Sequence, residues 1–147
     1  MMIVSNTSPL IAFSKIDKFK ILKELFRKIV IPETVYEEFL ANCTMEEKQR
    51  FIVARETFID KIVMTEIYSF SRKLGKGEQE ALSLAIRHQA DLLLMDDRKG
   101  YNEAKERNIN VASTRAILKI AEERNLISSY EEVVEQLRQR SFFLPNY

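Results

Sequence analysis

Short apolar runs alternate along this chain with longer segments of helical periodicity. The runs are rich in β-branched residues and leucine, which is typical of strands that are buried on both faces of a sheet. They are Ile3–Ser5, Ile29–Ile31, Lys61–Met64, Leu92–Met95 and Asn110–Ala112. Strands that alternate with helices form βαβ crossovers, which place a parallel sheet between two helical layers. The sequence therefore predicts an α/β fold with three layers, α/β/α, around a five-stranded parallel sheet.

Capping residues indicate where the helices between these runs begin. Thr44-Met45-Glu46-Glu47 and Ser129-Tyr130-Glu131-Glu132 are capping boxes, and the second opens a helix that is predicted to reach about Arg140. The other helices are expected from Ser8 as cap with Pro9 in the first turn, from Asp17 as cap, over Glu33–Ala41, after Gly77 through His88, over Arg98–Arg107 and over Thr114–Arg124. The segment 65–76 is expected to be a short helix or a loop.

Size and composition indicate one domain over residues 1–147. A chain of 147 residues buries roughly 70% of the surface that it exposes when unfolded, so it needs no metal or disulfide to fold. Its formal charge is +1, from 23 basic and 22 acidic residues, so overall charge gives no attraction to nucleic acid. An RNA-binding role would need a segregated basic face.

Other features indicate a cytoplasmic protein. The single cysteine, Cys43, has no partner for an internal disulfide, which is typical of a reducing compartment. The first residues carry no basic segment and only a short apolar run, so we expect neither a signal peptide nor a membrane span. Cys43 is expected to be inert, and the only histidine, His88, is expected to complement a helix dipole.

Acidic or amide side chains lie where predicted strands end. Asn6 follows the first strand, and Asp96 and Asp97 follow the fourth. In open α/β sheets, ligands bind in the crevice outside the carboxyl ends of the strands. Carboxylates gathered there favour a hard divalent cation such as Mg²⁺, which neutralises their mutual repulsion.

Helical periodicity selects two further acids for the same crevice. Glu78 shares the face of Ala81, Leu82 and Ala85, so we expect Glu78 rather than Glu80 to point inward. Glu38 follows the core-facing Val35 by three positions, so it is favoured over Glu37. Taken singly, Glu78 and Glu38 are more typical of a solvated helix surface than of a site, whereas Asp96-Asp97 before a helix are as typical of an N-cap and its neighbour as of a site. Their convergence on one edge of one sheet is what favours a site.

The order and spacing of four motifs resemble those of the PIN-domain proteins, in particular small prokaryotic members similar to the VapC toxins. The motifs are Ile3-Val4-Ser5-Asn6-Thr7-Ser8-Pro9-Leu10-Ile11, Val30-Ile31-Pro32-Glu33-Thr34-Val35-Tyr36-Glu37-Glu38, Gly77-Glu78-Gln79-Glu80-Ala81 and Asp91-Leu92-Leu93-Leu94-Met95-Asp96-Asp97-Arg98. The resemblance extends to about Ile127. It implies the strand order 3-2-1-4-5 and a ribonuclease that depends on Mg²⁺ or Mn²⁺. It also suggests a homodimer and, for a toxin, an antitoxin partner.

The resemblance implies a set of site residues. The metal and catalytic positions are Asn6, Glu38, Glu78 and Asp96, with Asp97 adjacent. Ser8 is the implied supporting hydroxyl, and Ser113 and Thr114 are weaker candidates for hydroxyls near the site. Residues expected to hold the RNA backbone flank the acids: Arg98, Lys99, Arg115 and Lys119, together with Arg72, Lys73 and Lys76.

One position departs from the family pattern, because Asn6 stands where the family commonly has Asp. An amide oxygen can ligate a hard cation but brings no charge, so metal binding should weaken. The alternative to an active ribonuclease is therefore a catalytically weak or inactive module that binds RNA or protein.

Other α/β proteins with acids in this crevice fit the chain less well. A phosphorylation receiver would carry its acid pair after the first strand, and no glycine-rich nucleotide-binding pattern occurs among Gly75, Gly77 and Gly100. For residues 129–147 two options stay open. The apolar Phe142-Phe143-Leu144 folds back onto the core, or it docks on a partner or a second subunit.

Overall fold

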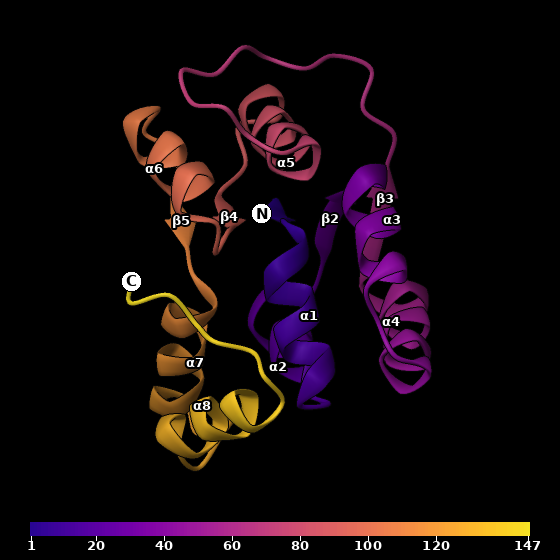
Figure 1. Ribbon diagram of the computed structural model, residues 1–147, viewed down its shortest axis with the longest axis vertical. Coiled ribbons are helices and arrows are strands. Elements are labelled where there is room, and N and C mark those ends of the chain that lie inside the picture. The colour runs from indigo at the N-terminus through magenta and orange to yellow at the C-terminus, as the bar shows by residue number, and fades with distance from the viewer.

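The computed structural model of residues 1–147 contains one five-stranded parallel sheet (Figure 1). Its strands are β1 (Ile3–Ser5), β2 (Ile29–Pro32), β3 (Ile59–Ile62), β4 (Leu92–Leu94) and β5 (Val111–Ala112). They lie in the order β3-β2-β1-β4-β5, and every neighbouring pair is parallel. The predicted fold and strand order are thus confirmed. β3 begins at the buried Ile59, two residues before the predicted start, and ends before Val63, which is exposed.

Eight helices connect and cover the strands. They are α1 (Thr7–Lys15), α2 (Phe19–Phe26), α3 (Glu33–Ala41), α4 (Met45–Thr57), α5 (Lys76–Arg87), α6 (Arg98–Glu106), α7 (Thr114–Glu123) and α8 (Tyr130–Gln139). None of them combines the length and the apolar character that crossing a bilayer requires. The predicted capping box at Thr44 is present with both of its hydrogen bonds.

Three helix starts differ from the prediction. α1 begins at Thr7 with Asn6 in the cap position, so Ser8 lies inside the first turn. α5 begins at Lys76, which places Gly77 inside its first turn. Asp17 does not cap α2, because its backbone adopts a φ of 53°, a left-handed conformation that aspartate tolerates. The segment between β3 and α5 forms no helix.

The core is divided by the sheet into two apolar layers. Because side chains alternate across a strand, Ile3 and Leu94 face the larger layer, which contains residues of α1–α4, α7 and α8. Val4 and Leu93 face the smaller layer, which contains residues of α5 and α6. Both faces of the sheet are therefore covered, which explains why the strands read as continuous apolar runs.

The register of β1 against β4 brings the residues after these strands to the same edge. Val4 pairs with Leu93 and Ser5 with Leu94, and the backbone N–H of Asn6 donates to the carbonyl of Leu94 over 2.9 Å. From β1 the chain proceeds to β2 on one side, and β4 lies on the other side. This is the switch point of the sheet, where α/β proteins form their crevice.

A buried carboxylate, Glu103 on α6, fastens the long segment between β3 and α5. It accepts hydrogen bonds from Ser71 Oγ (2.8 Å) and from the backbone N–H (3.1 Å) and Nη1 (3.2 Å) of Arg72, and its other oxygen accepts from Arg107 Nε (3.2 Å). Burial would raise the pKa of Glu103, but these donors outweigh it and lower the pKa to about 2. Arg72 also pairs with Glu106. The guanidinium of Arg72, which was expected to hold RNA, is therefore already paired with two acids.

We expect Glu103→Gln to lower the free energy of unfolding by about 2–3 kcal/mol, because an amide N–H₂ would face the guanidinium of Arg107. Urea titration at neutral pH measures this loss. Because the pKa of Glu103 is lower in the folded state, its ionised form stabilises the fold above the unfolded pKa of about 4.3, and this stabilisation is lost as the pH falls toward about 2. The difference in stability between variant and wild type should therefore shrink in acid. Glu106→Gln, at an exposed position, is the control and should cost much less than Glu103→Gln, because solvent screens its ion pair with Arg72. A Glu103 variant as stable as wild type would contradict this role.

Candidate active site

A cavity of about 550 Å³ opens at the carboxyl ends of β1 and β4. All five predicted metal or catalytic residues line it: Asn6, Glu38, Glu78, Asp96 and Asp97. They come from four separate parts of the chain, which the fold brings to one place. A larger hollow of about 660 Å³ lies between α2 and α4, but lysine and arginine side chains line much of it. The smaller cavity is therefore the candidate site.

Asn6 occupies the centre of the site and is only 2% exposed. Its Nδ2 donates to Glu78 Oε2 and to Met95 Sδ, both over 3.2 Å. Its Oδ1 is buried and has no hydrogen-bond partner. A buried polar atom without a partner costs free energy, so it needs an explanation such as a bound ion.

Asp96 is the most buried of the carboxylates at the site, with an exposed fraction of 6%. Its Oδ1 accepts from the backbone N–H of Thr114 (2.7 Å), and its Oδ2 accepts from the hydroxyls of Thr114 (2.6 Å) and Ser8 (3.1 Å). Burial raises the pKa of Asp96, although these donors oppose the shift. The predicted hydroxyls Ser8 and Thr114 therefore act on this carboxylate and fix its orientation.

Glu38 and Glu78 approach the cavity from α3 and α5. Glu38 Oε1 accepts from Thr7 Oγ1 over 2.7 Å. Its carboxylate lies so close to Gly77 that a Cβ at that position would collide with it. Burial raises the pKa of Glu78, the hydrogen bond from Asn6 opposes this, and the carboxylates of Asp97 and Glu38 raise it further. Glu78 thus lies in a field of like charge, as in a cation site.

Asp97 is the N-cap of α6. It is exposed, and its Oδ2 accepts from the backbone N–H of Gly100 over 2.8 Å. The cap interpretation of this acid is confirmed, although Asp97 also lines the cavity. Asp96 caps no helix.

In each pair of glutamates, the one favoured by helical periodicity lines the cavity. Glu78 lines the cavity and Glu80 does not, and Glu38 lines it whereas Glu37 is exposed. Glu80 was not expected to point inward, but it is buried and accepts from Thr34 Oγ1 over 2.5 Å. Both acids of α5 are therefore shielded from solvent, Glu78 partly and Glu80 almost completely, and they contact different neighbours.

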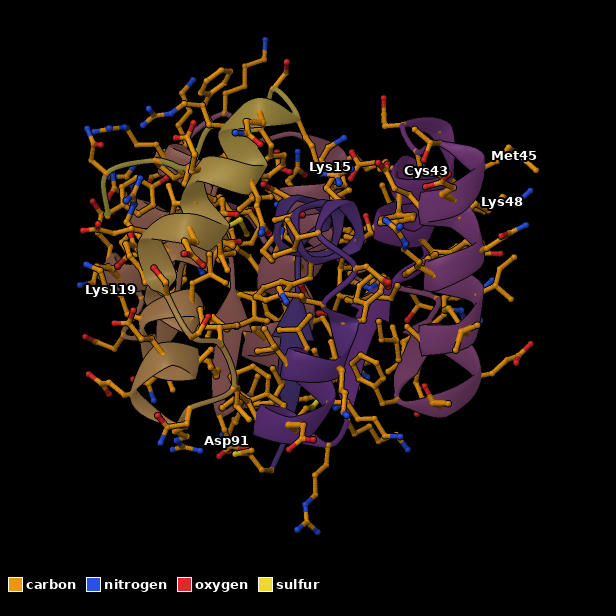
Figure 2. All side chains as sticks on the ribbon, turned by 90° about the horizontal axis from the view of Figure 1, so that it is seen from below. Lys15, Cys43, Met45, Lys48, Asp91 and Lys119 are labelled. Carbon is orange, nitrogen blue, oxygen red and sulfur yellow. The ribbon has the colours of Figure 1, made fainter.

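The predicted basic residues divide into two groups. Arg98 lines the cavity, whereas Lys99 is exposed and lies off its lining. Arg115 was expected to hold RNA, but its guanidinium donates to the carbonyl of Pro145 (2.8 Å) and to the hydroxyl of Tyr130 (2.6 Å). Lys119 lies over the Tyr130 ring and at the outer flank of α7 (Figure 2). Of the residues after the last two strands, Arg98 is thus the cation placed to meet a phosphate.

Two parts of the cavity wall were missed by the sequence analysis. Thr7 follows Asn6 directly, and only its position at the helix start could have indicated its contact with Glu38. The end of the chain folds back onto the protein, and Phe142 and Leu144 pack against the core. This segment contributes Phe143, Leu144, Pro145 and Tyr147 to the lining. Cys43 and the exposed His88 lie outside it.

The donor chemistry of the site fits a hard divalent cation, although no ion cage is preformed. The carboxylates and the unpartnered Asn6 Oδ1 are the oxygen ligands that Mg²⁺ and Mn²⁺ prefer. No three His, Cys, Asp or Glu side chains converge closely enough to hold one ion. Instead, neutral donors satisfy Glu38, Glu78 and Asp96 separately. A cation would therefore have to draw these side chains together.

Comparison with known proteins identifies the family. The family model DUF3368, PIN domain, matches residues 2–147. This chain therefore belongs to the PIN-domain family, whose fold is generally that of a nuclease.

One solved structure supports the fold, and a second has a lower similarity. A PilT N-terminus domain protein from the hyperthermophilic archaeon Sulfolobus solfataricus P2 has a TM-score of 0.61 at 20% identity, covering 82% of this chain and 93% of that one. A domain of a functionally unknown protein from Methanocaldococcus jannaschii DSM 2661 has a TM-score of 0.48 at 19% identity, covering 76% and 89% respectively. No curated protein matches the chain.

Proposed function

We propose that this protein is a divalent-metal-dependent endoribonuclease that uses Mg²⁺ or Mn²⁺. The observation that carries the proposal is the buried amide oxygen of Asn6, which has no partner and belongs to a residue that lines the cavity together with four carboxylates. A cation would satisfy this atom and neutralise the repulsion around Glu78. The fold supports a phosphodiester as substrate, because PIN domains are generally nucleases.

Each residue has a distinct task in the proposed reaction. Asp96, Glu78, Glu38 and the amide oxygen of Asn6 would hold the cation, with Asp97 at the rim. Ser8 and Thr114 orient Asp96, and Thr7 orients Glu38. When bound, the cation supplies a water of lowered pKa and stabilises the charge of the phosphate. Arg98 would pair with the RNA backbone at the cavity mouth.

The test of this function compares two glutamates on the same helix. Glu78→Gln keeps the hydrogen-bonding shape but removes a ligand charge at the cavity, whereas Glu80→Gln changes the buried acid that contacts Thr34. We expect cleavage of single-stranded RNA in Mg²⁺ or Mn²⁺ to fall at least about 100-fold for Glu78→Gln and to stay near wild type for Glu80→Gln. A chelator should abolish the activity of both. Equal cleavage by Glu78→Gln and wild type would end the assignment.

A specific observation also favours the alternative of a module that binds RNA or protein without cutting. Asn6 removes one negative charge, and no three acids converge on one point. Metal titration by calorimetry separates the two functions. Binding in the millimolar range or tighter supports the nuclease, and no binding supports the inactive module.

The cellular role that we propose is that of a cytoplasmic toxin, which acts as a homodimer and is neutralised by an antitoxin protein. It is supported by the resemblance of the four sequence motifs to small VapC-like members of the family. Growth arrest on expression, relieved by Asp96→Asn, would support this role. Unaffected growth with an active enzyme would contradict it.

A further inference from the structure

The segment Phe142–Tyr147 returns from α8 across α7 to the carboxyl edge of the sheet (Figure 1). Side chains at the start of α7 hold its backbone. Arg115 donates from Nε to the carbonyl of Pro145 (2.8 Å) and from Nη2 to that of Leu144 (3.4 Å), and Ser113 Oγ donates to the carbonyl of Tyr147 (2.7 Å). The segment is therefore fixed by several independent contacts.

Tyr147 anchors this segment to the site itself. Its hydroxyl donates to the backbone carbonyl of Asp96. Its ring lies 4.4 Å, centroid to centroid, from that of Tyr101, and the guanidinium of Arg98 lies 5.6 Å from its centre. Because Tyr101 and Arg98 already contact the ring of Tyr147, we assign Tyr147 to positioning the segment rather than to contacting a ligand.

Phe143 differs from its neighbours in this segment. Phe142 and Leu144 pack against the core, whereas Phe143 lines the acidic cavity and remains 71% exposed. Leaving a phenylalanine ring in water forgoes the free energy that its burial would give. The cavity still has a volume of about 550 Å³ with the segment in place, which lies in the range of small-ligand sites. The segment thus forms a wall of the cavity and does not fill it.

We propose that Phe143 is a specificity-determining residue that stacks on a base of single-stranded nucleic acid, while Arg115 and Tyr147 position it. The inference rests on the proposed function, because the acids beneath would act on the adjacent phosphate. An aromatic ring accepts the face of any base, whereas bases within a duplex are already stacked. The site should therefore select unpaired RNA with little preference for sequence.

The test measures binding of a fluorescent single-stranded oligoribonucleotide by anisotropy in EDTA, where metal-dependent turnover is blocked. We expect Phe143→Ala to raise Kd about tenfold, Phe143→Leu to lose most of the same affinity and Phe143→Tyr to stay near wild type. Val63→Ala, at another exposed apolar position, is the control and should bind like wild type. A duplex of the same sequence should show no dependence on Phe143.

Several outcomes would overturn the inference. Wild type that does not bind the single strand, or a Kd unchanged in Phe143→Ala, excludes stacking. Faster cleavage by Phe143→Ala would show that the segment covers the site instead of binding substrate. Failure of the proposed function looks different. Binding that depends on Phe143, without any metal-dependent cleavage, rejects the nuclease but supports the stacking role.

Discussion

Asp96→Asn is expected to abolish RNA cleavage, with a loss of at least about 100-fold, while the protein keeps its fold. The amide can reproduce the present contacts. Its oxygen accepts from the backbone N–H of Thr114, and its nitrogen donates to the hydroxyls of Thr114 and Ser8, which can rotate to accept. Because burial raises the pKa of Asp96, the neutral amide avoids the cost of a buried charge. Cleavage kinetics and a thermal melt without metal measure the two effects.

Asp97→Asn is the matched control for this change. It removes the neighbouring charge at an exposed position, and an asparagine can keep the cap on Gly100. We expect it to retain much more activity than Asp96→Asn. Equal losses in the two variants would contradict the distinction between a buried ligand and a cap at the rim.

Asn6→Asp is expected to be less stable than wild type without metal and to gain more stability than wild type when metal is added. In a chelator, the new carboxylate would face Glu78 without the hydrogen bond that Asn6 Nδ2 now donates. Burying this like charge should lower the free energy of unfolding by about 2 kcal/mol. With Mn²⁺ the added charge should tighten metal binding at least about tenfold.

Thermal melting with and without Mn²⁺, together with calorimetry, measures both effects of Asn6→Asp. The rise in melting temperature on adding Mn²⁺ should be larger for the variant than for wild type, since a ligand stabilises the state that binds it. Asn42→Asp serves as the control, because Asn42 also lines the cavity but lies at its exposed rim. An Asn6 variant with no gain in Mn²⁺ affinity would exclude residue 6 from the metal site.

The sequence was sufficient to predict the sheet and most of the helices because these depend on local patterns. Continuous apolar runs that alternate with helical segments indicated the parallel sheet, and the capping box at Thr44 marked the start of α4. Helical spacing also favoured Glu78 and Glu38, and both line the cavity. The bounds of β3 were missed, because the exposed Asp60 interrupts the apolar pattern after Ile59, and because the exposed Val63 and the partly buried Met64 extend the apolar run beyond the end of the strand.

What the sequence could not provide were contacts between distant segments. The partners of Arg115 lie in residues 130–145, so no local pattern distinguished it from a phosphate-binding arginine. Arg72 is likewise paired with acids more than thirty residues away. The packing of Glu80 against Thr34 depends on how α5 docks on the start of α3. The same holds for Phe143, whose place on the cavity follows from the return of the chain across α7.

The most direct measurement is a crystal soaked with Mn²⁺ and examined for anomalous scattering. The proposed function predicts one or two peaks within about 2.5 Å of carboxylate oxygens of Asp96 and Glu78, with Asn6 Oδ1 as a neutral ligand. Glu38 should turn from Thr7 toward the same ion. A map with no peak in this cavity, from crystals that bind Mn²⁺ elsewhere or not at all, would contradict a metal-dependent nuclease.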